Sequence, residues 1–177
     1  MTEPRLRLAG KADADSLSAL ATLVWLHTYA LDGMRPALAR YVATGLNAAA
    51  FRQVLSDPSR QLWVLERNGH LLAYAQLRWQ AAAHNVPETR AELETLYVMP
   101  RFAGQGFGRR LLQAALAAAR EHGEGGLWLT VYAGNAPALA FYQSMGLQDR
   151  GEAWFEMEGE RHANRLLFLP ALSSGNP

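Results

Sequence analysis

A glycine-rich segment near the middle of the chain has the residue types of an anion-binding loop. Residues 103–108 read AGQGFG, and Arg109 and Arg110 follow directly. Glycines let the backbone approach a ligand closely, and the first turn of a helix offers unpaired N–H groups and a positive dipole end. The two arginines add full positive charges. The expected chemistry is the binding of a phosphate or pyrophosphate group.

The residues on either side of this loop predict a strand before it and a helix after it. The apolar run 96–99, LYVM, has strand character and stops at Pro100. Between positions 111 and 119, leucines and alanines recur at helical spacing. The order strand, glycine-rich turn, helix therefore places the glycines at a helix N-terminus.

Two common phosphate-binding loops do not fit these residues. A P-loop continues into Lys-Ser or Lys-Thr, and no such pair follows the glycines. A Rossmann turn needs a third glycine at the position that Arg109 occupies. The loop instead resembles motif A of the GCN5-related N-acetyltransferase (GNAT) superfamily, which is Arg/Gln-x-x-Gly-x-Gly/Ala after a strand that ends in Tyr/Ala-Val.

The resemblance implies that the cofactor is acetyl-CoA, with coenzyme A as product, because motif A holds the pyrophosphate of acetyl-CoA. Ala103 stands where the superfamily usually has Arg or Gln. Arg101, Gln105 or the arginine pair 109–110 could supply the missing polar group. The implied cofactor-binding residues are Leu96, Tyr97, Val98, Ala103, Gly104, Gln105, Gly106, Phe107, Gly108, Arg109, Arg110, Asn135 and Tyr142.

A second match lies at residues 135–147, NAPALAFYQSMGL, which resemble the superfamily's Asn-x-x-Ala-x-x-Phe-Tyr-x-x-x-Gly-Phe motif. Asn135 is predicted to cap a helix, and the resemblance implies that it also contacts the cofactor. Tyr142 lies where the superfamily often has the acid that protonates the leaving thiolate. The pKa of a phenol is about 10 and that of a thiol is about 8.5, so return of a proton from a tyrosine to the leaving thiolate is feasible. The alternative is that Tyr142, like Phe141, is a core aromatic.

Two glutamates are candidates for the base that removes a proton from the acceptor amine. Glu92 and Glu94 stand two residues apart and therefore share one face of the predicted strand. Glu92 matches a glutamate that serves as base, directly or through water, in several members of the superfamily. A solvated polar strand face is the alternative for both, and a water chain can also do the work.

Aromatic side chains could line a pocket for the acceptor. Trp25, Tyr29 and Trp79 are predicted in this role, although aromatics at helical spacing more often belong to a core. The segment Trp25-x-x-Thr28-Tyr29 also resembles, more weakly, the bacterial polyamine and small-amine branch. Four glutamates between 152 and 160 are expected to attract one ammonium group, which favours a monoamine over a long polyamine. The five histidines form no ligand pair, so no metal site is predicted.

Composition bounds the class of protein. The chain has 177 residues, of which 50% are hydrophobic, and a net charge of +1, so no footprint for nucleic acid is expected. The absence of cysteine excludes disulfides and cysteine nucleophiles. The N-terminus lacks a signal-peptide pattern, and no apolar run reaches the roughly 18 residues of a membrane helix. A cytoplasmic protein without membrane contacts, possibly a homodimer, is expected.

The predicted elements follow the order of the GNAT fold. One domain is expected over residues 1–170, with a disordered tail at 171–177. Strands are predicted at 5–8, 62–66, 71–79, 92–99, 127–132, 147–157 and 165–169, and helical segments at 16–27, 36–55, 106–122 and 135–145. The resemblance implies an α/β (α+β) fold with a mixed, mostly antiparallel sheet, splayed at its fourth and fifth strands and flanked by helices.

Three functions agree with these features. The leading hypothesis is an acetyl-CoA-dependent N-acetyltransferase that acts on a primary amine of a small molecule by direct attack. The second is a protein N-terminal or lysine acetyltransferase of the same fold. The third is a non-catalytic acyl-CoA-binding or regulatory domain, which the change at Ala103 favours and an intact Tyr142 and Asn135 oppose.

Overall fold

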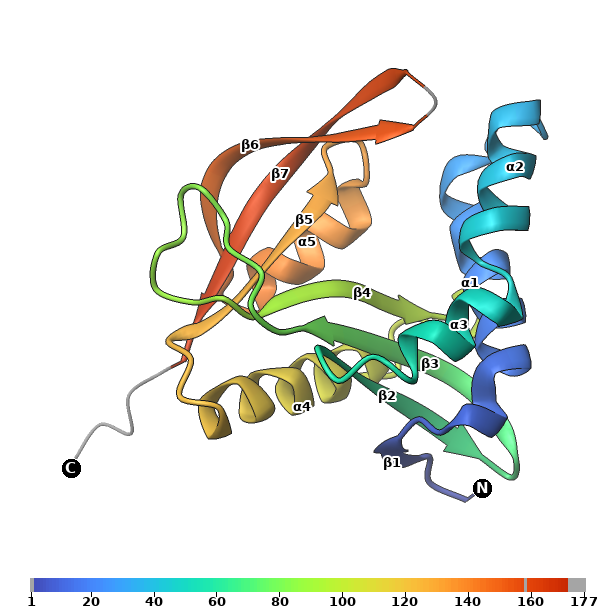
Figure 1. Ribbon diagram of the computed structural model, residues 1–177, viewed down its shortest axis with the longest axis horizontal. Helices are drawn as coiled ribbons and strands as arrows, with labels where there is room; N and C mark the ends of the chain where they lie inside the picture. Colours follow the sequence, from blue (N-terminus) through green and yellow to red (C-terminus); the bar gives the residue numbers. More distant parts are fainter. Residues whose placement is uncertain (1, 158, 172–177) are drawn as a thin grey trace. The chain divides into compact units, whose positions relative to one another are not determined.

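The structure is a computed structural model that describes residues 2–157 and 159–171 (Figure 1). The chain divides into two compact units. The first comprises Met1–Gln76 and Thr95–Leu112, and the second comprises Leu77–Glu94 and Gln113–Pro177. Two strands and one helix begin in one unit and end in the other.

The first unit contains the N-terminal strand, three further strands or strand segments, three complete α-helices, the start of a fourth and the glycine-rich loop. Its elements are β1 (Arg5–Leu8), η1 (Lys11–Asp13), α1 (Ala14–Tyr29), α2 (Pro36–Gly45), α3 (Ala48–Val54), β2 (Arg60–Arg67), most of β3 (His70–Arg78), the end of β4 (Glu92–Val98), η2 (Pro100–Phe102) and the start of α4 (Phe107–Glu121). The buried residues of α1 recur every three or four positions, at Leu17, Leu20, Ala21 and Val24, so this helix packs one apolar stripe into the core.

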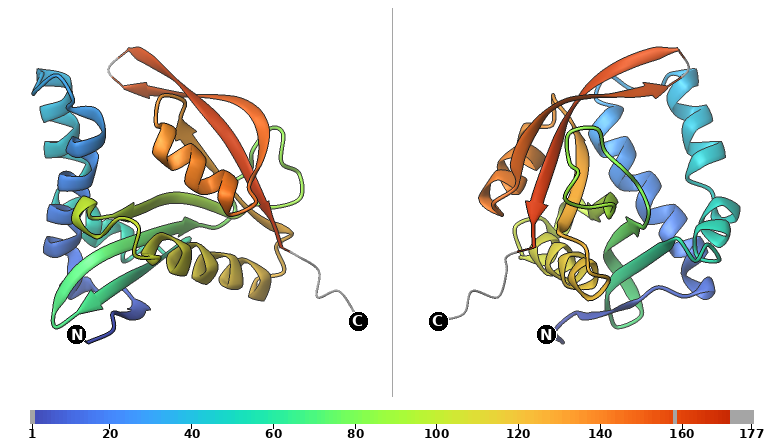
Figure 2. Two further views of the ribbon diagram at one scale, coloured as in Figure 1. Left: turned by 180° about the vertical axis from the view of Figure 1, so that it is seen from behind. Right: turned by 60° about the vertical axis from the view of Figure 1, so that its left-hand side comes forward.

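The second unit contains the remainder of α4 and the C-terminal strands. Its other elements are β5 (Gly126–Tyr132), α5 (Ala136–Ser144), β6 (Gln148–Met157) and β7 (Glu160–Pro170). β7 pairs antiparallel with both β5 and β6. In Figures 1 and 2, α5 lies on one side of these three strands. Leu127, Leu129 and Leu167, which share a strand face, are buried.

Among the described residues, seven strands form a sheet in the order β1-β2-β3-β4-β5-β7-β6. β1 pairs antiparallel with β2, whereas β4 and β5 pair in parallel, with Glu92 opposite Trp128. A mixed, mostly antiparallel sheet with flanking helices confirms the predicted fold class. The parallel pair joins the two strands at which the resemblance implied a splay.

The loop at 79–91 is fastened to β5, and this fixes the point at which β4 begins. Trp128 donates from its indole nitrogen to the carbonyl of Ala81 at 2.8 Å. The buried hydroxyl of Thr89 donates to the Gly126 carbonyl at 2.8 Å and accepts from the Ala91 amide. Because these bonds hold residues just before Glu92, the start of β4 has a defined position on β5.

Most predicted element bounds agree with the structure to within two residues, and β7 differs most. β7 begins at Glu160, five residues before the predicted start, because its ladder with β6 continues to the Met157–Glu160 pair. Asp13 immediately precedes α1, and its carboxylate accepts two hydrogen bonds from Arg7. Residues 172–177 of the predicted tail lie outside the described residues. No described helix has the length and apolar character needed to cross a membrane.

Candidate active site

The glycine-rich loop of the first unit is exposed and open. Gly104 and Gly106 have φ angles of +77° and +79°, a conformation that side chains rarely adopt. Apart from the chain neighbours, no heavy atom of the described residues lies within 4 Å of a Cβ built on either glycine, so a ligand can approach this backbone closely. The amide of Arg110 donates to the Gly106 carbonyl at 3.1 Å, which starts α4 directly after the loop. The first-turn N–H groups of residues 107–109 therefore have no partner within the helix.

Aromatic packing fixes the two ends of this loop. Phe107 is buried, and its ring lies 6.4 Å from that of Phe102 in η2. The guanidinium of Arg67 lies over the Phe102 ring at 5.4 Å. These contacts hold both ends of the loop in place, and a preorganised loop lowers the entropic cost of binding a flexible pyrophosphate.

The arginines around the loop differ in their surroundings. Arg110 donates to the carbonyl of Pro4 at 2.9 Å and lies 3.8 Å from the Glu3 carboxylate, so its charge is shared with the N-terminal segment. Arg101 and Arg109 are exposed. These two side chains are better placed than Arg110 to compensate for Ala103.

The end of β4 is tied to the first unit's core. The Met99 amide donates to Leu72 in β3 at 3.0 Å, and the ring of Tyr97 meets that of Tyr74 edge-on at 5.6 Å. Burial raises the pKa of Tyr74, which keeps that phenol neutral. Leu96, Tyr97 and Val98 are all half-buried. The strand bulge expected from the family remains a prediction.

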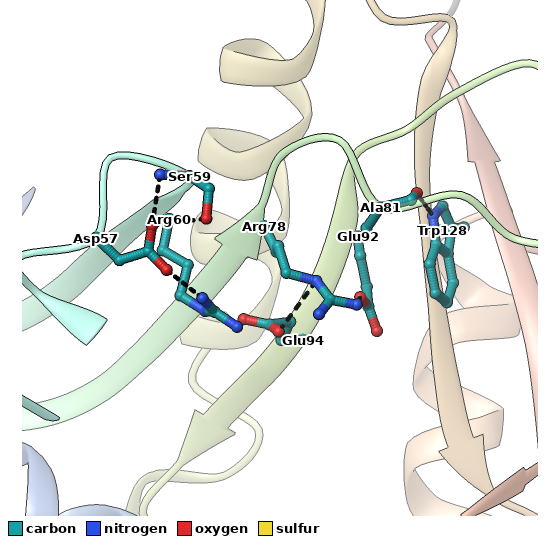
Figure 3. A network of polar contacts seen from close by, with 8 residues as sticks. All are labelled: Asp57, Ser59, Arg60, Arg78, Ala81, Glu92, Glu94 and Trp128. Carbon is teal, nitrogen blue, oxygen red and sulfur yellow. Dashed lines mark hydrogen bonds and ion pairs between the residues drawn. The ribbon is translucent and has the colours of Figure 1, made fainter. Parts of the chain in front are cut away.

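The two candidate bases are joined by one arginine in the second unit (Figure 3). Arg78 donates to Glu92 at 2.5 Å, and its Nε lies 3.3 Å from Glu94 Oε1. The two carboxylates are only 15% and 18% exposed, so the positive charge between them offsets much of their repulsion. Both glutamates are therefore held on one face of β4, as their spacing predicted. Arg78 was not foreseen from the sequence.

The second predicted motif forms the N-terminus and the middle of α5. Asn135 caps this helix as predicted, because its Oδ1 accepts from the Ala138 amide at 3.2 Å. Tyr142 is 8% exposed, with the ring of Phe141 at 5.2 Å. The Tyr142 carbonyl accepts from the Leu147 amide at 3.1 Å, which ends the helix before β6. Its phenol is thus carried on a well-fixed part of α5.

The aromatic residues predicted for the acceptor pocket belong to different units of the chain. In the first unit, Trp25 is 4% exposed and stacks on Tyr41 at 4.6 Å, while Tyr29 is 39% exposed. In the second unit, Trp79 stacks on His122 at 3.9 Å, just beyond the last turn of α4. Trp25 therefore packs as a core residue, whereas Tyr29 and Trp79 retain exposed surface.

The acidic run on the last hairpin is divided between two sheet faces. Glu152 stands opposite Arg165, and Glu156 stands opposite Arg161, whose Nε lies 3.6 Å from its carboxylate. Glu160 stands one residue before Arg161 and five before Arg165, so its side chain points to the opposite face of β7 from both arginines. Glu158 lies outside the described residues. The three described glutamates therefore do not share one sheet face.

The structure also reveals polar residues that were not singled out from the sequence. Thr130, Tyr132, His162 and Asn164 lie on the same sheet face of β5 and β7. The alternation of side chains along a strand would have placed His162 and Asn164 on this face only if the strand predicted at 165–169 had begun at Glu160. No group of three or more His, Asp or Glu side chains in the described part of the chain is arranged to hold a metal ion.

Comparison with known proteins now decides the family. The model of the acetyltransferase (GNAT) family matches residues 25–147. The chain belongs to the acetyltransferase (GNAT) family. An N-acetyltransferase of Mycobacterium tuberculosis (strain ATCC 25618 / H37Rv), described only as uncharacterized, is 31% identical over 160 residues, which cover 90% of this chain and 98% of the relative. This GNAT protein is accordingly an N-acetyltransferase.

Solved GNAT structures share its fold. PaiA N-acetyltransferase from Thermoplasma acidophilum, solved with coenzyme A, superposes with a TM-score of 0.71 at 18% identity and covers 93% of this chain and 98% of its own. YncA from Salmonella typhimurium, a putative acetyltransferase solved with acetyl-CoA, gives a TM-score of 0.65 at 23% identity, with coverage of 99% and 98%. These complexes agree with the predicted cofactor.

Proposed function

We propose that this GNAT enzyme transfers the acetyl group of acetyl-CoA to a primary amine of a small molecule by direct attack. The observation that carries the proposal is the arginine-bridged pair of glutamates on β4. An amine arrives as an ammonium ion and must lose a proton before it can attack. Glu92, either directly or through water, accepts that proton, and Arg78, which also pairs with Glu94, holds the Glu92 carboxylate in place.

The exposed loop supports acetyl-CoA as the acyl donor. Gly104 and Gly106 leave room for the pyrophosphate, the first turn of α4 offers N–H donors, and Arg101 and Arg109 supply positive charge. The strand end at Leu96–Val98 is proposed to bind the pantetheine. Asn135 is proposed to contact the cofactor from the start of α5.

The chemical step requires three proton transfers. The ammonium ion first gives a proton to Glu92 or its water, and the neutral nitrogen then attacks the thioester carbonyl carbon, so that the new C–N bond forms. As the C–S bond breaks, Tyr142 gives its proton to the thiolate of coenzyme A, and the attacking nitrogen loses its second proton, which restores the Tyr142 phenol through water. The products are an N-acetylated amine and free coenzyme A.

A second candidate function is acetylation of a protein N-terminus. N-alpha-acetyltransferase RimI of Mycobacterium tuberculosis is 35% identical over 103 residues, but these cover only 58% of this chain and 61% of that protein. Streptothricin acetyltransferase of Streptomyces lavendulae, whose name states a small-molecule substrate, is 36% identical over 88 residues, or 50% and 44%. These partial similarities support neither acceptor class over the other.

The test is a panel of acceptors assayed by release of the coenzyme A thiol. The panel contains aliphatic monoamines, aromatic monoamines, polyamines and peptides with free N-termini. A thermal shift with acetyl-CoA is measured in parallel. The proposal expects stabilisation by acetyl-CoA and turnover of at least one small amine. Stabilisation with turnover of peptides alone supports the second candidate, and stabilisation without any turnover supports a non-catalytic acyl-CoA-binding protein.

A further inference from the structure

One face of β5 and β7 changes from apolar to polar along its length. The face is defined by Trp128, Thr130 and Tyr132 of β5 and their partners Phe168, Leu166 and Asn164 of β7, and is called here the Trp128 face. Residues directly opposite each other in a ladder point to the same side of the sheet. Trp128, Leu166 and Phe168 are buried in a cluster with Ala81 and Val86 of the preceding loop.

Beyond this cluster the Trp128 face is polar and partly open to solvent. Thr130 is exposed, and Tyr132 and Asn164 are half-buried. The Asn164 amide donates to the Thr130 hydroxyl at 3.5 Å, the long limit of a hydrogen bond. His162 is the next residue of β7 on this face, and Phe155 stands opposite it on β6. Polar and aromatic groups thus gather where the loop no longer covers the strands.

His162 has the surroundings of a residue that binds a ligand group. Its ring lies 6.5 Å from Tyr132, nearly perpendicular to it, and 6.4 Å from Phe155. Its Nε2 atom is buried yet has no hydrogen-bond partner within the described part of the chain. Oε2 of Glu160 lies 3.6 Å from this Nε2 atom, beyond hydrogen-bond range. A buried polar atom without a partner is costly, and a bound ligand group would relieve that cost.

The Tyr132 ring is held in place by the backbone that follows it. A Cβ built on Gly134 would come within 2.5 Å of the Tyr132 ring, so only glycine leaves the ring in its position. The Asn135 amide also donates to the Tyr132 carbonyl at 2.9 Å. The Tyr132 ring beside His162 therefore occupies space that only a glycine at position 134 leaves open.

The polar part of the Trp128 face lies on the same side of the sheet as the candidate base. Glu92 pairs with Trp128, so both side chains point to this face. Thr130 stands two residues farther along β5 than Trp128, about 7 Å, and Tyr132 about 13 Å. An amine bound against these residues would therefore lie on the same sheet face as the Glu92 carboxylate.

We propose that Thr130, Tyr132, His162 and Asn164, with Phe155 beside them, form the acceptor-binding surface of the enzyme, and that His162 determines specificity. This inference rests on the proposed function and narrows its substrate class. Two aromatic walls favour a flat ring, and the buried Nε2 favours a hydrogen-bonding substituent on that ring. The acceptor is therefore a primary monoamine with an aromatic body that carries a hydroxyl or similar group.

Tyramine and phenethylamine test this assignment, because they differ by one ring hydroxyl. We expect the wild-type protein to acetylate tyramine with a kcat/KM about tenfold higher, the effect of one hydrogen bond to a buried group. His162→Phe keeps a ring but removes Nε2. It should reduce the tyramine preference to about twofold or less, chiefly through KM for tyramine, with acetyl-CoA affinity unchanged. The control is His70→Phe, at an exposed position at the start of β3, which should leave the preference unchanged.

Two further measurements keep the test decisive. His162→Gln, which retains a polar side chain, should keep part of the preference and serves if the phenylalanine variant does not fold. Gly134→Ala, which forces the Tyr132 ring to move, should raise KM for both amines. An equal preference in the wild type and in both His162 variants overturns the assignment. Turnover of other amines in the panel but of neither aromatic amine also overturns it while leaving the proposed function intact, whereas turnover of no amine rejects both.

Discussion

Arg78 donates a hydrogen bond from Nη2 to Oε2 of Glu92 at 2.5 Å. The donor stands at the end of β3 and the acceptor at the start of β4, on either side of the loop that Trp128 and Thr89 fasten to β5. A carboxylate held in this way is oriented before substrate binds. Preorganisation of this kind lowers the cost of reaching the transition state.

Glu92→Gln should therefore slow acetylation by removing the proton acceptor. We expect kcat/KM to fall mainly below the pKa of the acceptor amine, where a proton must still be removed. A pH–rate profile of the purified variant measures the effect. Glu94→Gln is the matched control, since it keeps Glu92 and its bond to Arg78. A Glu92→Gln profile that superimposes on wild type, with a loss in the Glu94 variant, would assign the base to Glu94, and a loss in neither would favour a water chain.

Tyr142→Phe should lower kcat by roughly 10²-fold or more, the usual scale for a positioned acid. Acetyl-CoA binding should change little, because the ring and its packing on α5 are retained. Steady-state kinetics and calorimetry with acetyl-CoA separate the two effects. Wild-type turnover in a folded variant would show that Tyr142 is a packing residue.

Gly106→Val should weaken acetyl-CoA binding by at least tenfold, about 1.4 kcal/mol. Valine strains the positive φ and places a branched side chain where the pyrophosphate is proposed to lie. Gly123→Val is the matched control, because Gly123 also has a positive φ, +76°, and open space, but lies beyond the other end of α4. The free energy of unfolding should fall in both variants, and only Gly106→Val should lose affinity for acetyl-CoA. If calorimetry gives the Gly106→Val and Gly123→Val variants the same affinity for acetyl-CoA, the assignment of the glycine-rich loop to pyrophosphate binding is wrong.

Asp13→Asn should destabilise the protein in a pH-dependent way. The hydrogen bonds from Arg7 hold the pKa of Asp13 below its ordinary value of 3.8. The folded state thus binds this proton less readily than the unfolded state, so the pair stabilises the fold above about pH 3.8 and the contribution is lost as the pH falls further. Thermal unfolding should show a lower Tm for the variant at pH 7 and a shrinking difference below pH 4. Asp15→Asn, at an exposed pair with Arg52, should change little at either pH.

A monoamine should be a better substrate than spermidine. Glu152 and Glu156 each stand opposite an arginine, so the hairpin offers no continuous acidic surface for several ammonium groups. Steady-state kinetics with spermidine and with a set of monoamines, at two salt concentrations, compare the two classes. A spermidine kcat/KM above that of every monoamine and falling steeply with salt would restore the polyamine hypothesis.

The sequence by itself determined the features that depend on local spacing. Glycine permits positive φ angles that other residues rarely adopt, and Gly104 and Gly106 have them. Asn135 caps α5 because a cap depends on residues three positions apart. The spacing of Glu92 and Glu94 put both on one strand face for the same reason. Order and type of the elements followed from these local rules and from the family motifs.

The tertiary structure decided which residues meet across strands. Arg78 and Glu92 are 14 residues apart, and the ion pair exists because the intervening loop is bonded to β5. β7 extends back to Glu160 because of its ladder with β6, not because of its own composition. His162 is therefore part of a strand only through this pairing. Tyr132 and His162 are 30 positions apart in sequence and come together only through the β5–β7 register. Contacts of this kind depend on long-range pairing, which local propensity does not encode.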